Sequence, residues 1–259
     1  PGVGQNLQDH SCIILQYACK KSFPIHKVNQ PHRKLATGIR WVFTRKGIAS
    51  SNIWEAGGLI RSSSKTAYPD IQYHFGPVGF EYNANKISLL QAFAIHVDQL
   101  RPRSRGQVTL KSANPLEKPL MTFNYLQHPE DLSEMLNGIK KARELISQLA
   151  FDEFRGVELI PGPKVQSDAQ IVEFIKSAAE TDYHPSCTCA MGTGEMAVVD
   201  DQMKVQGIER LRVVDASVMP KIISGNLNAS TQMIAARAAD IILGRDQLNP
   251  IKANFAFEE

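Results

Sequence analysis

Long hydrophobic runs are missing from this 259-residue sequence. Its longest apolar stretches are interrupted by Arg, Lys, Asp or Glu well short of the ~20 residues that a membrane-spanning helix needs. The sequence therefore argues against a transmembrane protein. Attachment to a membrane surface stays open, because it requires no long apolar segment.

Strong charge and abundant cysteine are absent as well. The 29 Lys and Arg residues nearly balance the 26 Asp and Glu residues, and a net charge of +3 is too small to predict a nucleic-acid partner. Only four cysteines occur, and a chain of this length can build a core without disulfides. We therefore expect reduced thiols at Cys12, Cys19, Cys187 and Cys189.

The amino end lacks two further features. The chain begins at Pro1 without an initiator methionine and without the basic and apolar regions of a signal peptide. This pattern is typical of a sequence entered in its middle, with any targeting segment upstream.

The composition that is present, 43% hydrophobic and 21% charged, is that of a globular protein. Short apolar segments separated by Ser, Gly, Asn and Pro predict strands in an antiparallel or mixed sheet. These strands are expected at 12–19, 53–61, 70–75, 92–97, 107–111 and 211–214. Helical spacing of apolar residues predicts helices at 31–46, 129–149, 168–179 and 229–243. Together they predict an α+β fold.

Two short motifs invite a functional interpretation that the residues do not support. The opening Gly2-Val3-Gly4 begins like a dinucleotide-binding fingerprint, but Leu7 replaces the third glycine, so we expect a structural loop. His184 stands beside Cys187 and Cys189, but this set lacks the second ligand pair of common zinc motifs, so we expect no metal. His184 is then either a buried structural histidine or a catalytic one.

Three segments near the carboxyl end and one at the amino end closely resemble the glucose–methanol–choline (GMC) oxidoreductase family. They are His184–Cys189, Leu211–Pro220, Ser224–Thr231 and Gly2–His10, and the resemblance runs from residue 1 to about residue 245. Within the family, several segments are most similar to the choline dehydrogenase branch: Tyr183–Cys189, Ser224–Ala229, the segments around Trp54 and His74, and the turn at 103–106.

This resemblance implies a division of the chain. Residues 1–20 would connect to a flavin domain, 21–182 would form the substrate-binding domain, 183–245 would carry catalytic and flavin-contacting residues, and 246–259 would be a tail. The last strand and helix would complete an FAD-binding domain whose glycine-rich turn is not in this sequence. The chain alone would then be inactive.

The family pattern also implies roles for individual residues. His184 would be the base that takes the hydroxyl proton of the alcohol, since an imidazole titrates near neutral pH, and Asn226 would hold the substrate oxygen. Asp215 and Ala216 would contact the flavin. Asn228 would either contact the flavin or only cap the last helix.

A quaternary ammonium group donates no hydrogen bond, so its recognition depends on aromatic faces and diffuse negative charge. By resemblance, Trp54, Glu55 and His74 lie on the substrate side, although Trp54 could also simply pack in the core. Trp54 and Glu55 would point to opposite faces of a regular strand. The carboxylate that choline oxidase places upstream of this strand has no obvious counterpart here.

The function that the resemblance implies is FAD-dependent oxidation of choline to betaine aldehyde. A quinone of the respiratory chain would accept the electrons, with peripheral membrane association and a location at the mitochondrial inner membrane. Two alternatives remain: oxidation of another primary alcohol or a sugar, and a flavin-free remnant that serves as an interaction domain.

Overall fold

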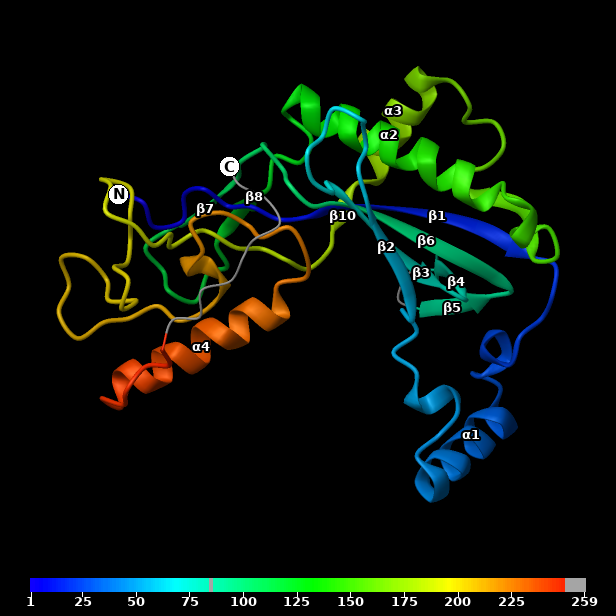
Figure 1. The fold of residues 1–259 in the computed structure, drawn as a ribbon, viewed down its shortest axis with the longest axis horizontal. Helices are drawn as coiled ribbons and strands as arrows, with labels where there is room; N and C mark the ends of the chain where they lie inside the picture. Colours follow the sequence, from blue (N-terminus) through cyan, green and yellow to red (C-terminus); the bar gives the residue numbers. More distant parts are fainter. Residues whose placement is uncertain (84–85, 250–259) are drawn as a thin grey trace.

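The computed structural model describes residues 1–83 and 86–249, and it is an α+β structure as expected. Its centre is a six-stranded antiparallel sheet in the order β10-β1-β6-β3-β2, with β9 also pairing with β1 (Figure 1). The strands are β1 (Ser11–Cys19), β2 (Ala56–Ile60), β3 (Ile71–Gly76), β6 (Ala92–Gln99), β9 (Arg155–Ile160) and β10 (Glu180–Thr181).

One face of this sheet forms the main hydrophobic core. Successive strand residues point to opposite faces, so Ile13, Tyr73 and Val97 share this face with their apolar neighbours two positions away. Helices α2 (Pro129–Ile146) and α3 (Asp168–Ala178) lie together over it (Figure 1). Met135 and Ile139 of α2 are fully buried against the strands.

The opposite face of the same strands is polar. Gln72 faces Asp98 and His74 faces His96 across β3 and β6, while Cys12 of β1 faces Asp98 from the other side. Directly opposed residues of antiparallel strands point to the same face, so all five side chains project to one side. The hairpin of β4 (Gly79–Asn83) and β5 (Lys86–Leu90) lies over this face near Gln16 of β1, whose Nε2 donates to the carbonyl of Phe80.

The remaining elements lie around this body. Helix α4 crosses the side where the amino terminus lies, and α1 lies apart from the sheet at the other end (Figure 1). These elements are α1 (Pro31–Thr44), α4 (Asn228–Ile242), β7 (Gln107–Thr109), β8 (Leu120–Thr122) and the 3₁₀ turns Pro24–Lys27, Ile48–Ser50, Leu149–Phe151 and Ala216–Val218. No helix within the described ranges is long and apolar enough to cross a membrane.

The predicted helices are confirmed to within a few residues at their ends. Ser167 and Gln170 form the expected capping box, in which each side chain accepts from the other's backbone N–H. The last helix ends just before Gly244, which adopts a φ of 66°. The prediction of free thiols is also confirmed, since all four cysteines lie in described positions and none is in a disulfide.

Two strand predictions need correction. Residues 211–214 form no strand: this segment pairs with residues 203–205 only through one isolated bridge, Arg212 with Lys204, and two backbone hydrogen bonds, which is too short a ladder for a strand. The strand expected from residue 53 begins only at Ala56, because Ile53 adopts a φ of 72° that extended backbone does not allow.

The opening segment is a structural loop, as predicted. It pairs with two distant segments, through Leu7 with Gly106 and through Gln8 with Ser186. Gly4 has a φ of 80°, and a Cβ there would lie 2.1 Å from the carbonyl oxygen of Val108. The loop therefore depends on glycine because neighbouring backbone approaches it closely.

Candidate active site

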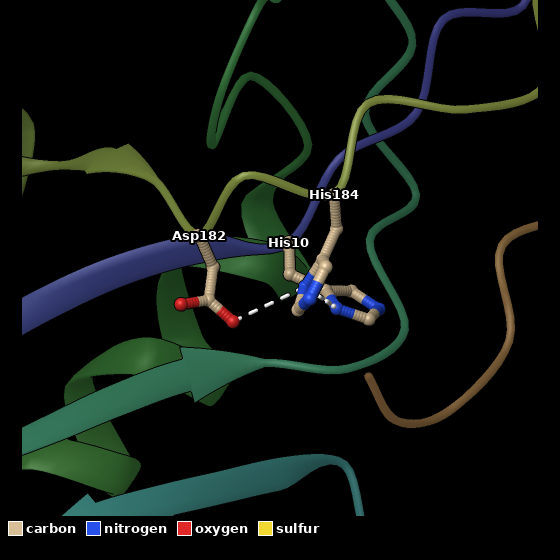
Figure 2. A group of neighbouring side chains, drawn as sticks. All are labelled: His10, Asp182 and His184. Atoms are coloured by element: carbon tan, nitrogen blue, oxygen red, sulfur yellow. Dashed lines mark hydrogen bonds and ion pairs between the residues drawn. The ribbon is translucent and has the colours of Figure 1, made fainter. Parts of the chain in front are cut away.

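His184 lies in the loop that follows β10 and is held there from both sides. Its backbone N–H donates to Oδ1 of Asp9 at 2.9 Å. Its ring nitrogen Nδ1 lies 3.0 Å from Nδ1 of His10 and 3.1 Å from Oδ2 of Asp182 (Figure 2). The resemblance indicated His184 alone, whereas the structure places it in a cluster of three titratable side chains.

His10 is the buried member of this cluster. It is only 1% exposed, and its Nε2 lies 3.0 Å from the carbonyl oxygen of Ile223. Burial, with a further contribution from the neighbouring His184 ring, lowers the pKa of His10 to about 4. His10 is therefore neutral near pH 7.

A second group of polar side chains stands on the polar sheet face. Nδ1 of His74 lies 2.7 Å from Oδ2 of Asp98, and this hydrogen bond raises the pKa of His74. Burial raises the pKa of the Asp98 carboxyl. His96 lies opposite His74, and burial lowers its pKa to about 4. The face thus combines a proton-binding pair with a neutral imidazole.

Asn226 comes to this face from the carboxyl-terminal segment. Its Oδ1 accepts a hydrogen bond of 3.0 Å from Nε2 of Gln72, which also lies 2.8 Å from Nε2 of His74. Asp98 and Asp182 connect the two groups, because their carboxylate oxygens and a His74 nitrogen all lie within 4.8 Å of one another. His184, His74 and Asn226 therefore belong to one continuous polar site.

Trp54 closes one side of the site. Its ring centroid lies 4.5 Å from that of His96 and 6.4 Å from that of His74. Glu55 follows it and is exposed. Both residues precede β2 and follow the positive φ of Ile53, so the alternation of a regular strand does not apply to them.

The residues expected at the flavin lie at the edge of the same region. Asp215 caps the turn Ala216–Val218, with its Oδ1 accepting from the N–H of Ser217 at 2.8 Å. The carbonyl of Ala216 in turn accepts from the N–H of Cys187 at 3.3 Å. This contact fixes the flavin-side turn against the loop that carries His184.

Asn228 does not cap α4. The residue before the helix is Leu227, and Oδ1 of Asn228 accepts from Nε2 of Gln232 at 3.0 Å instead. An apolar side chain cannot accept from the first N–H groups, so these donors stay available at the start of the helix. The capping interpretation of Asn228 is therefore wrong, and flavin contact stays a prediction.

Several members of the site were not singled out from the sequence. They are His10, Asp182, Gln72, His96 and Asp98. The signal for the last two was present in the alternation of 93–98, where His96 and Asp98 alternate with apolar residues that form the core. Among the described residues, three sets of side chains could hold a metal ion by distance, and hydrogen bonds or ion pairs join members of each set. The sets are His10, Asp182 and His184; Cys12, His96 and Asp98; and His74, Asp98 and Asp182. The expectation of no metal stays a prediction.

A comparison with protein families finds one model that matches residues 102–235, described as GMC oxidoreductase. Among curated proteins, the chain is 49% identical over 248 residues to an oxygen-dependent choline dehydrogenase from Pseudomonas aeruginosa. The match covers 96% of this chain and 44% of that protein. The chain thus spans less than half the length of the curated relatives it matches.

Solved structures show the same relationship at lower identity. A pyridoxine 4-oxidase from Mesorbium loti is 26% identical with a TM-score of 0.75, covering 95% of this chain and 45% of that one. A variant of the formate oxidase from Aspergillus oryzae, solved to study modification of its FAD, is 25% identical with a TM-score of 0.82. It covers 94% of this chain and 48% of that one.

The expected location at the mitochondrial inner membrane is wrong. The similar curated proteins come from bacteria, among them Pseudomonas aeruginosa, Serratia proteamaculans and Acinetobacter baumannii, which have no mitochondria. The family model, the curated relatives and the shared fold agree with one another, and the chain belongs to the GMC oxidoreductase family of FAD-dependent enzymes.

Proposed function

We propose that this chain is the carboxyl-terminal part of an FAD-dependent enzyme that oxidises choline to betaine aldehyde. The observation that carries the proposal is the convergence of Trp54, His74, His184 and Asn226, from four separate segments, on the polar sheet face. The names of the curated relatives support choline as the substrate. In the complete protein, the product would supply betaine formation.

The residues present fit the flavin end of FAD. Helix α4 starts without a side-chain cap, so its first N–H groups and its positive dipole end are available to an electron-rich ring edge. Asp215 and Asn228 are exposed beside this end, and a Cβ at Gly225 would meet no atom within 4 Å. Ala216, at the turn that the His184 loop contacts, would complete the flavin side.

Bound FAD would supply the acceptor for the hydride that leaves the alcohol carbon. The chain's own residues would do the rest. His184 would take the hydroxyl proton, and the Asn226 amide would hold the alcohol oxygen while negative charge develops there. Gln72 fixes the orientation of that amide through its hydrogen bond to Oδ1.

The same face offers what a quaternary ammonium group needs. The Trp54 ring gives an aromatic face, and the carboxyl group of Asp182 lies beyond the His74–Asp98 pair as a source of negative charge. Glu55 is exposed next to Trp54 and would add charge at the entrance. His74 would stay on the substrate side, with its ring held by Asp98.

The proposal is tested with a flavin absorbance spectrum of a longer protein, in which this chain is extended upstream to include a flavin-binding domain of the GMC family. We expect the extended form to be yellow, and choline to bleach it without oxygen. A Trp54→Ala variant should require about 2- to 30-fold more choline, which corresponds to about 0.5–2 kcal/mol for one aromatic face. Its response to 3,3-dimethylbutan-1-ol, an uncharged analogue of choline, should change less.

Each other outcome has a definite meaning. A yellow protein that ignores choline but is bleached by another alcohol or a sugar would reject choline and keep the family chemistry. An extended form that never binds flavin would reject the catalytic proposal and favour a flavin-free interaction domain.

We further propose that the electrons pass to a quinone in a membrane and that α1 attaches the protein there. Residues 20–46 hold eight Lys or Arg residues and no Asp or Glu. All of α1 is described and none of its residues is buried, and its apolar side chains Leu35, Ile39, Val42 and Phe43 are exposed. A basic amphipathic helix of this kind is typical of binding to anionic membrane surfaces.

Sedimentation with phosphatidylserine-containing vesicles checks this attachment. We expect the double variant Ile39→Ser/Phe43→Ser to lose most binding, about tenfold or more, because apolar burial drives insertion. Leu116→Ser is the control, since Leu116 is 90% exposed outside this helix. Equal binding of all forms, or reoxidation by oxygen alone in the presence of a quinone, would contradict the proposal.

A further inference from the structure

His10 lies where two chain segments hold it firmly. The preceding Gln8 exchanges backbone hydrogen bonds with Ser186, at 3.1 Å and 2.9 Å. The carbonyl of His10 itself accepts from the N–H of Asp182 at 3.0 Å. The His10 ring is thus fixed between the loop that carries His184 and the segment that carries Ile223 and Asn226.

The hydrogen bonds of His10 define which of its nitrogens carries the proton. The carbonyl oxygen of Ile223 can only accept, so Nε2 of His10 donates to it. A neutral imidazole has one N–H, and burial keeps His10 neutral near pH 7. Nδ1 of His10 is therefore a lone pair that accepts.

This assignment transfers to His184. Because Nδ1 of His10 accepts, the proton between the two rings belongs to Nδ1 of His184. The geometry at Asp182 supports the same assignment, since its Oδ2 lies 3.1 Å from that nitrogen and can accept the same N–H. A neutral His184 then carries its lone pair on Nε2, the ring nitrogen on the other side.

We propose that His10 is a positioning residue that, together with Asp182, keeps His184 protonated at Nδ1 and leaves Nε2 free to take the alcohol proton. The catalytic half of this inference rests on the proposed function, whereas the tautomer of His184 does not. The charged or titratable groups that interact with the two imidazole residues are Asp9 and Asp182, and the His74–Asp98 pair lies beyond Asp182.

The tautomer is measured directly by ¹⁵N NMR of the full chain labelled at histidine, because protonated and unprotonated ring nitrogens have separate shifts. The sequence holds seven histidines, and the His184→Asn variant assigns the signals of His184. In the wild type, at pH values where the His184 ring is neutral, we expect its one proton on Nδ1. Protonation at Nε2 would overturn the proposal without reference to activity.

Two variants of His10 carry the test into catalysis in the flavin-bound enzyme. His10→Phe keeps an aromatic ring but removes both ring nitrogens, the acceptor for His184 included, and we expect kcat for choline to fall about 10-fold or more with KM changed less than about 3-fold. His10→Asn returns an acceptor near the position of Nδ1 and should recover most of kcat. The low-pH limb of kcat should move in His10→Phe and return in His10→Asn.

The outcomes separate the two ideas. An Nδ1 proton on His184 that becomes mixed in His10→Phe, with kcat unchanged, would confirm that His10 sets the tautomer and reject His184 as the base. An unchanged tautomer in a folded His10→Phe would overturn the role of His10. If His10→Phe does not fold, the wild-type and His10→Asn spectra still decide the assignment.

Discussion

Replacing His184 by Asn should lower kcat for choline about 10²- to 10⁴-fold, the usual contribution of a positioned general base. Asn keeps a hydrogen-bonding group near Asp182 and His10 but cannot take a proton at neutral pH. The measurement is the rate of anaerobic flavin bleaching in the complete flavin-bound protein. The substrate concentration for half-maximal rate should change much less.

The matched control is His32→Gln, because His32 is exposed on α1, apart from the polar sheet face. It should leave the bleaching rate unchanged. A His184→Asn enzyme that binds flavin and reduces it within a few-fold of the wild-type rate would move the base to another side chain. His74 would then be the next candidate, because its hydrogen bond with Asp98 raises its pKa.

Asp131→Ala should give the largest loss of stability, about 3 kcal/mol or more in the free energy of unfolding. The Asp131 carboxylate is fully buried at the start of α2. It accepts from the backbone N–H of Arg103 at 2.9 Å, and from the N–H and the hydroxyl of Ser104 at 2.8 Å and 2.6 Å. Alanine would leave all these donors without a partner, which chemical denaturation would detect.

The turn at 103–106 gives this substitution a second effect. Gly106 pairs with Leu7, so loosening the turn also loosens the segment that holds His10. Asp131→Asn keeps one acceptor oxygen and should cost less, and Asp201→Ala, on the surface, should change stability by less than about 0.5 kcal/mol. Equal stability of Asp131→Ala and Asp201→Ala would contradict the argument.

The sequence was a good guide to the helices and a weaker one to the strands. The signals that start and end a helix, such as the Ser167–Gln170 capping box and Gly244, are local in sequence and need no distant partner. A strand forms only where another strand lies beside it. The segment 211–214 has strand-like residues, but its pairing with residues 203–205 amounts to one isolated bridge, so it stays irregular.

The site was predicted only where the family resemblance identified a residue. His184 and Asn226 were named in this way, and the structure brings them to the same polar face. His10 was quoted within the opening segment but given no role, because its partners His184 and Ile223 lie 174 and 213 residues away. The mitochondrial location of the protein was inferred from the resemblance without any residue to support it, and that prediction was wrong.

The long sequence separation within the site sets when it can first exist during synthesis. The segment that carries His10 is made before its partners, because its ring partner Ile223 and the amide of Asn226 follow more than 200 residues later. At roughly 5–20 residues per second, a ribosome needs roughly 10–40 s to add them. The buried imidazole is therefore without its native partners throughout that interval, and the catalytic centre cannot form before Asn226 has been added.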